Sequence, residues 1–297
     1  MKKPIVFFLS AATLLAVSSC GGDSEKTDET DIIDSTKVED TQVSPISETF
    51  FQVPSPGEML TFIKMIGNNN KDTKMLNPAS NAKNYTDAKS KALNFGIYSC
   101  DLSYCSIFEI GAEALKYFPV VKSLGDQIGV STAIKPEILK RLQDNLGKPD
   151  SLALITDDIY FSSFETLEGS KQGPTLACVV AGGWIESIYI ATQLAQYKAN
   201  SPIIERLADQ KYTLENIIEF FKKHEADPNV ASIKADFESL LAEFNKIAEK
   251  DVEATKQADG NKTKVLGGGK QLNISEENYN GIKQKIKAIR DGYAQIK

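Results

Sequence analysis

Histidine is almost absent from this chain of 297 residues, since His224 is the single one. One imidazole cannot assemble a three-histidine zinc site, a ferritin-like di-iron site or an H-E-x-x-H protease motif. A serine or cysteine triad would need this same histidine, and no nucleophile-elbow pattern accompanies it. His224 follows Lys222 and Lys223 at the expected end of a helix, where cationic groups offset the helix dipole. We therefore expect no transition metal and no cofactor.

Cysteine is also scarce, and its four positions include no C-x-x-C pair. This spacing excludes thioredoxin-like, zinc-ribbon and haem-attachment sites. Cys100 and Cys105 are too far apart on one straight helix to form a disulfide, whereas Cys178 could in principle pair with either. Because cysteine is among the most buried residue types, we predict that these three are thiols in the core.

An excess of positive charge is missing as well, with 34 basic against 40 acidic residues. A nucleic-acid partner would require a basic face, so none is expected. Most of the negative charge is local, because residues 21–50 contain nine acidic residues against Lys26 and Lys37. Such a composition cannot bury enough apolar surface to fold. The sequence predicts a disordered acidic tether at 20–50 and one nearly neutral domain at 51–297.

The first 19 residues have the pattern of a secretory signal peptide, with Lys2 and Lys3 before an apolar stretch from Pro4 to Val17. This stretch is shorter than the ~20 residues that a membrane-spanning helix needs. Val17-Ser18-Ser19-Cys20 then resembles the lipobox of bacterial lipoproteins, whose cysteine thiol receives a diacylglycerol before cleavage. The alternative is an ordinary signal peptide followed by a cysteine by chance.

The lipobox resemblance implies that Cys20 becomes a lipidated N-terminus that anchors the protein to an envelope membrane. In Gram-negative lipoproteins an aspartate after this cysteine favours the inner membrane, so Gly21 indicates the outer membrane. An acidic run at this place also resembles signals that bring some lipoproteins to the cell surface. The resemblance therefore leaves two orientations open, toward the periplasm or toward the cell surface.

Helical periodicity and helix-boundary residues predict an all-α domain, a single bundle of about ten helices. Ser55-Pro56-Gly57-Glu58 has the pattern of a helix start, with Glu58 placed to close a capping box. Pro119 is expected to interrupt a helix after Phe118, and a second helix is expected to resume there and to end near Gly125 to Gly129. Ser275 is expected to cap the last helix. The other helices are expected at about 86–118, 150–168, 174–198, after Pro136, after Pro202, 213–224 and 230–254, and a small hairpin at 264–266 and 271–274.

The segment Leu176–Ala191 is apolar on nearly all sides, apart from Glu186 and Ser187. A helix without a polar face belongs at the centre of a domain. Three apolar helices also carry an acid three residues before a tyrosine, a spacing that places both on one face. With Trp184 as an aromatic wall, these pairs predict one polar pocket. The alternative is that the acid and the tyrosine of each pair hydrogen-bond to each other or face water. Its members are Asp101, Tyr104, Asp157, Tyr160, Trp184, Glu186 and Tyr189.

A second resemblance covers roughly residues 50–200. Pro54-Ser55-Pro56, the run from Lys91 to Tyr98, Asp101–Tyr104 and Gly182–Glu186 are similar to segments of helical lipoproteins of Gram-negative envelopes. The resemblance implies an all-helical domain that faces the periplasm or the cell surface. It carries no assigned activity and no catalytic residue.

Because the common catalytic and metal-binding patterns fail, the sequence favours a non-enzymatic binding or scaffold domain. Besides the membrane, its partner would be an envelope protein or a small ligand. One alternative is a glycan hydrolase that draws an acid and a base from Asp101, Asp157, Asp158 and Glu186. Another is a purely structural envelope component. Two carboxyl groups across an open cleft would favour the hydrolase, whereas dispersed carboxylates would favour the scaffold.

Overall fold

A computed structural model describes residues 55–295, apart from 136, 146, 253–254, 260–261 and 267–268. The signal peptide, Cys20 and the acidic tether lie outside these residues. The described part is a multi-helical bundle, which confirms the all-α class. Its helices are α2 (Pro56–Met65), η1 (Ala79–Asn84), α3 (Ala88–Ile107), α4 (Gly111–Gln127), α5 (Glu137–Asp144), α6 (Pro149–Gly169), α7 (Gly173–Leu194), α8 (Pro202–Lys222), α9 (Pro228–Phe244) and α10 (Glu276–Tyr293).

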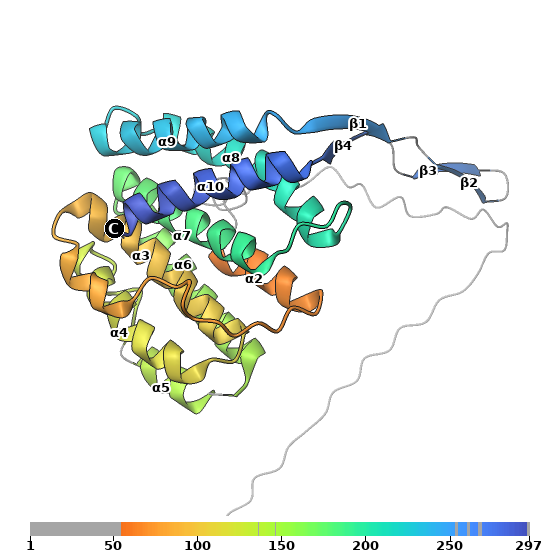
Figure 1. Ribbon diagram of the computed structural model, residues 1–297. Coiled ribbons are helices and arrows are strands. Elements are labelled where there is room, and N and C mark those ends of the chain that lie inside the picture. Colours follow the sequence, from red (N-terminus) through yellow and green to blue (C-terminus); the bar gives the residue numbers. More distant parts are fainter. Residues whose placement is uncertain are drawn as a thin grey trace, which may run out of the picture. The chain divides into compact units, whose positions relative to one another are not determined.

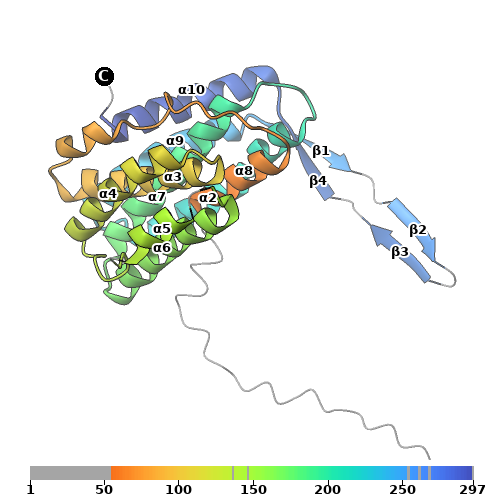
Figure 2. The same cartoon turned by 90° about the horizontal axis from the view of Figure 1, so that it is seen from below.

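Helix α7 lies at the centre of the bundle and contacts α2, α3, α6, α8, α9 and α10 (Figures 1 and 2). This confirms the position predicted from its lack of a polar face. Among the described helices it is also the one long and apolar enough to cross a membrane, but 94% of its most apolar window is buried. Such burial is typical of the core helix of a globular domain.

Helices α3 and α7 cross with their backbones in direct contact, and glycines make this possible. A β-carbon on Gly96 would lie 2.2 Å from the carbonyl oxygen of Val179, and one on Gly182 would lie 1.9 Å from that of Leu93. No side chain fits into such a gap. Gly96 and Gly182 therefore allow the two helices to approach more closely than larger residues would permit.

The break between α3 and α4 lies at Glu109, and the prediction that Pro119 interrupts a helix is wrong. Glu109 has a φ of 61°, and the Ile110 N–H donates to the Cys105 carbonyl, which closes a Schellman motif. Pro119 lies inside α4, where the buried Phe118 and Val121 on either side hold the helix in place. Packing here outweighs the hydrogen bond that proline removes.

Two further boundaries differ from the prediction in the second half of the chain. The helices expected after Pro202 and at 213–224 are one continuous helix, α8. The helix expected at 230–254 ends at Phe244, and a strand follows it. The strands are β1 (Ala248–Val252), β2 (Thr255–Asp259), β3 (Lys262–Leu266) and β4 (Gly269–Asn273).

The strands form two antiparallel pairs, β1 with β4 and β2 with β3. The two predicted strands, 264–266 and 271–274, overlap β3 and β4, but they do not pair with each other. Instead β3 pairs with β2, and β4 pairs with β1. The sequences of β1 and β2 are mostly polar and do not alternate between apolar and polar residues, so they gave no strand signal. Ser275 caps α10 as predicted, since its hydroxyl accepts a hydrogen bond from the Asn278 N–H.

Candidate functional site

Asp101 of α3, Glu186 of α7 and Arg290 of α10 meet in the core, and we call them the buried charge cluster. Both carboxyl residues are 0% exposed and Arg290 is 2% exposed. Arg290 donates from Nε to Glu186 Oε2 at 2.7 Å and from Nη2 to Glu186 Oε1 at 2.9 Å. This two-bond geometry is the strongest form of a carboxylate–guanidinium pair. Glu186 therefore finds its donors in the last helix and not in a tyrosine.

Asp101 is the member of the cluster without an arginine hydrogen bond. Its Oδ2 accepts the backbone N–H of Asn77 at 3.2 Å, while the equally buried Oδ1 has no donor among the described residues. Burial and the neighbouring Glu186 charge raise the pKa of Asp101 well above its usual range. This shift favours the protonated form, which needs no counterion in the core. Arg290 and Glu186 thus form the ion pair of the cluster, and Asp101 lies beside this pair.

The Arg290 side chain is held from several directions. Its Nη2 also donates to the Met75 carbonyl at 3.1 Å, and its guanidinium lies 4.5 Å from the ring centroid of Tyr189. Nη1 makes only a long contact, 3.5 Å, with Asp291. Tyr189 therefore belongs to the site through a cation–π contact and not as a hydrogen-bond partner of Glu186.

The other residues of the predicted pocket lie elsewhere. The Tyr104 hydroxyl donates to the carbonyls of Asn70 and Asp72, under the loop that follows α2. Tyr160 is buried against Gly183 on the α6 side of α7. A spacing of three residues fixes the helix face, but not the neighbouring element that this face meets. The structure therefore brings Asp101, Glu186 and Tyr189 together and separates the remaining four.

A cavity of about 510 Å³ lies above the cluster, between the segment 74–84, α7 and α10, and we call it the Arg290 cavity. Its volume falls within the range of small-molecule sites. Apolar side chains, among them Met75 and Pro78, form part of its wall. The polar side chains include Lys74, Asn81, Asn84, Lys287, Arg290 and Asp291. Sequence patterns gave no sign of this cavity, because its walls come from three distant segments.

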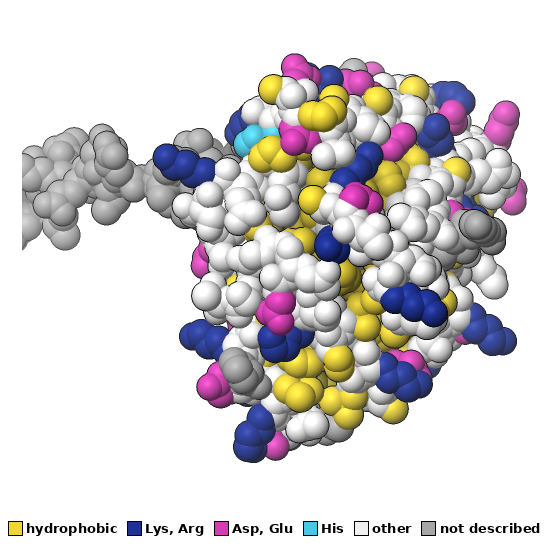
Figure 3. Space-filling view, turned by 90° about the vertical axis from the view of Figure 1, so that its left-hand side faces the viewer, with side chains coloured by type: hydrophobic (Ala, Val, Ile, Leu, Met, Phe, Trp, Pro, Cys, Tyr) yellow, Lys and Arg dark blue, Asp and Glu magenta, His cyan; other side chains and the backbone are white. Residues whose placement is uncertain are grey.

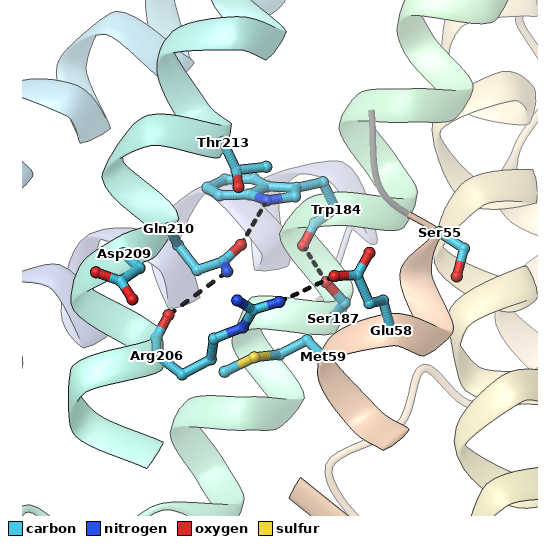
Figure 4. A pocket seen from close by; sticks show the side chains of 9 residues that line it. All are labelled: Ser55, Glu58, Met59, Trp184, Ser187, Arg206, Asp209, Gln210 and Thr213. Atoms are coloured by element: carbon cyan, nitrogen blue, oxygen red, sulfur yellow. Dashed lines mark hydrogen bonds and ion pairs between the residues drawn. The ribbon is translucent and has the colours of Figure 1, made fainter. Parts of the chain in front are cut away.

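Trp184 lines a different and much smaller cavity of about 70 Å³ between α2, α7 and α8. Its indole N–H donates to Gln210 at 3.3 Å. Figure 4 shows Arg206 reaching from α8 toward Glu58 of α2, where the two form an ion pair of 2.9 Å. A space of this size holds a few water molecules. Asp209 and Thr213 also line this cavity, which is separate from the space beside Glu186 and Tyr189.

Asp157 lies on α6 against the start of α2, near Gly57. The Ser55 hydroxyl hydrogen-bonds to this carboxylate and makes no cap for α2, so the predicted capping box is not formed. Burial, with smaller contributions from Asp158 and Glu58, raises the pKa of Asp157 to about 6. At neutral pH the residue is therefore mostly ionised, at a cost in stability.

Asp157→Asn is expected to stabilise the protein at pH 7 by about 1–3 kcal/mol. The folded chain keeps a proton on Asp157 up to about pH 6, whereas the unfolded chain loses it at the lower, ordinary pKa. Between these two values the stability of the wild type must fall as pH rises, and asparagine removes this loss. Urea unfolding at pH 4.5 and at pH 7 measures the difference in free energy of unfolding between the wild type and the variant. The same difference at both pH values would contradict the prediction.

The three cysteines of the described domain are free thiols and are buried, as predicted. Burial raises the pKa of Cys178 to about 12, which makes its thiol unreactive. His224 packs its ring edge-on against Phe220, and burial together with Lys223 lowers its pKa. The imidazole is thus mostly neutral at pH 7, so it does not supply the cation expected at this helix end. No group of three potential metal ligands occurs among the described residues.

The described domain thus belongs to the class of all-α bundles, and a buried three-residue charge cluster lies at its core. Comparison with protein-family models, with curated proteins and with solved structures found no match.

Proposed function

We propose that this chain is the precursor of an envelope lipoprotein, anchored through a lipidated Cys20, in which the helical domain acts as a non-enzymatic binding or scaffold module. The signal-like segment and Val17-Ser18-Ser19-Cys20 support the anchor, and Gly21 supports the outer membrane. The acidic segment 20–50 would serve as the spacer between the membrane and the domain. The domain would face the periplasm or the cell surface.

The observation that carries the non-enzymatic role is the placement of the carboxylates. A glycoside hydrolase needs two carboxyl groups that flank an open substrate cleft. Asp101 and Glu186 are fully buried, and Glu186 is held by Arg290. Asp158 is exposed and forms a surface ion pair with Arg141 at 3.3 Å. Asp157 lies on α6 beside the start of α2. Two of the four acids are thus enclosed together in the core, and the other two lie apart from them on α6.

The surface also agrees with a binding or scaffold role that excludes nucleic acid. Figure 3 shows one face on which acidic and basic side chains alternate without a large area of one sign. The chain from residue 51 onward has nearly equal numbers of basic and acidic residues. Such a surface does not attract a polyanion over long distances.

A carboxylate-dependent hydrolase is the second candidate, and one observation favours it. A pKa of about 6 is what a general acid needs near neutral pH, and Asp157 has this value with Glu58 close enough to influence it. If this pair were catalytic, both Asp157→Asn and Glu58→Gln would abolish the release of reducing ends from peptidoglycan. The proposed function predicts that the wild type releases none.

Cys20→Ala is expected to abolish the incorporation of radioactive palmitate, because no thiol remains at the lipobox position to accept the diacylglycerol. The variant should accumulate as the uncleaved precursor or appear in the soluble fraction. Cys178→Ala is the matched control, since this buried thiol lies within α7 and its loss should leave labelling intact. Unchanged palmitate labelling of Cys20→Ala would contradict the lipoprotein proposal.

A further inference from the structure

Cations outnumber anions around the Arg290 cavity. Its lining carries three cationic side chains, from Lys74, Lys287 and Arg290, against the single carboxylate of Asp291. Asp291 is already paired with Lys287. In the described part of the chain the Lys74 ammonium has no ion-pair partner. Even after Glu186 beneath the floor is counted, the cavity keeps a positive charge, although the domain as a whole is nearly neutral.

The guanidinium at the floor is fixed before any ligand arrives. Glu186, the Met75 carbonyl and the Tyr189 ring hold Arg290 in one orientation, so an incoming anion does not have to order it. Its Nη1 makes only the 3.5 Å contact with Asp291, which leaves N–H donor capacity on that nitrogen. A preorganised donor of this kind is what a binding site for a carboxylate or phosphate requires.

Neutral donors and an apolar wall complete the site. The amide of Asn81 donates one N–H to Asn77 at 3.0 Å and retains another, and the Asn84 amide also lines the cavity. Met75, Leu76 and Pro78 supply an apolar surface beside these groups. A ligand with an anionic end and a short hydrocarbon part matches both halves of the lining.

We propose that the Arg290 cavity binds a small organic anion, a carboxylate or phosphate monoester with a short apolar chain. Arg290 and Lys287 hold the anionic group, Lys74 closes it from the loop side, and the hydrocarbon part lies along Met75 and Pro78. This inference rests on the proposed function, because it gives the binding module its ligand class.

Isothermal titration with the full-length protein in phosphatidylcholine nanodiscs tests the proposal, with empty nanodiscs as the blank. The probes are hexanoate, hexyl phosphate, inorganic phosphate and the uncharged hexanol, at low ionic strength. Hexanoate and hexyl phosphate are expected to bind saturably, inorganic phosphate more weakly and hexanol not at all. Lys74→Gln and Lys287→Gln should each weaken hexanoate binding about tenfold, the loss typical of one charge-assisted hydrogen bond.

Lys122→Gln is the matched control for Lys287→Gln. Lys122 forms the same kind of ion pair, four residues before Asp126 on α4, at 2.8 Å. Its loss should leave hexanoate binding unchanged, and an unchanged melting temperature of all three variants verifies their folding. Equal binding of hexanol and hexanoate, no effect of either cavity variant, or no saturable binding up to about 10 mM would overturn the proposal.

These outcomes can be separated from failure of the proposed function. Absence of anion binding with intact palmitate labelling would overturn the cavity proposal alone. Loss of the lipid anchor or cleavage of a glycan would overturn the proposed function, whatever the cavity binds.

Discussion

Replacing Arg290 with methionine is expected to lower the free energy of unfolding by about 3–5 kcal/mol, the cost of removing one partner from a buried ion pair. The substitution leaves Glu186 charged in a fully buried position, and it also removes the donor to the Met75 carbonyl. Methionine retains the length and the apolar part of the side chain. The lost free energy of unfolding therefore comes mainly from the unpaired charge of Glu186. Urea unfolding at pH 7, followed by far-ultraviolet circular dichroism, measures it.

Two further variants isolate the charge. The double variant Glu186→Gln with Arg290→Met should recover most of the lost stability, because no unpaired charge remains in the core. Asp101→Asn should lower the free energy of unfolding by less than about 1 kcal/mol. Asparagine is neutral, as protonated aspartic acid is, and it likewise offers both a hydrogen-bond donor and an acceptor. A double variant as unstable as Arg290→Met alone would show that packing, and not the charge of Glu186, dominates the site.

Gly182→Ala is expected to destabilise the protein by about 3 kcal/mol or more, at the upper end of the range for overpacked cores. The added methyl group would lie 1.9 Å from the Leu93 carbonyl oxygen, which belongs to the backbone and cannot rotate away. Helices α3 and α7 would have to separate, and the contacts along the whole crossing would weaken. Thermal and urea unfolding both measure the effect.

Gly292→Ala in α10 is the matched control for this substitution. A β-carbon there meets nothing within 4 Å, and alanine favours a helix more than glycine does. This variant should therefore gain about 0.4–1 kcal/mol. If Gly182→Ala were as mild as this control, the close crossing of the two helices would be disproved.

The helical class and the central helix were predictable because they depend on local patterns. Leu176–Ala191 has no polar face, and this alone requires surrounding elements on all sides. The thiol state of the three core cysteines followed in the same way from residue type and spacing. The Pro119 prediction failed because the loss of one hydrogen bond is a local cost, whereas α4 packs against α3 and buries Phe118 and Val121.

The candidate site was only partly predictable. Asp101 and Glu186 could be selected because carboxylates are rare in apolar helices, but their partner lies 104 residues after Glu186. One signal for Arg290 was present: it follows Ile286 by four residues and precedes Tyr293 by three, which places a cation on the apolar face of α10. A buried acid without a local donor and a cation on an apolar face are complementary. Periodicity alone does not say that they meet.

The position of Arg290 in α10 also affects the order in which the protein can fold. Until α10 has been synthesised, a compact core would enclose Glu186 without the guanidinium that pairs with it, which would destabilise the native arrangement of the earlier helices. The Tyr85 hydroxyl and the Asn94 amide likewise donate to the carbonyls of Ala294 and Tyr293, so these hydrogen bonds form only after the end of α10 is present. The packing of the core around Glu186 therefore depends on the last helix. A chain exported as proposed would benefit, because a secretion channel threads polypeptides before they fold.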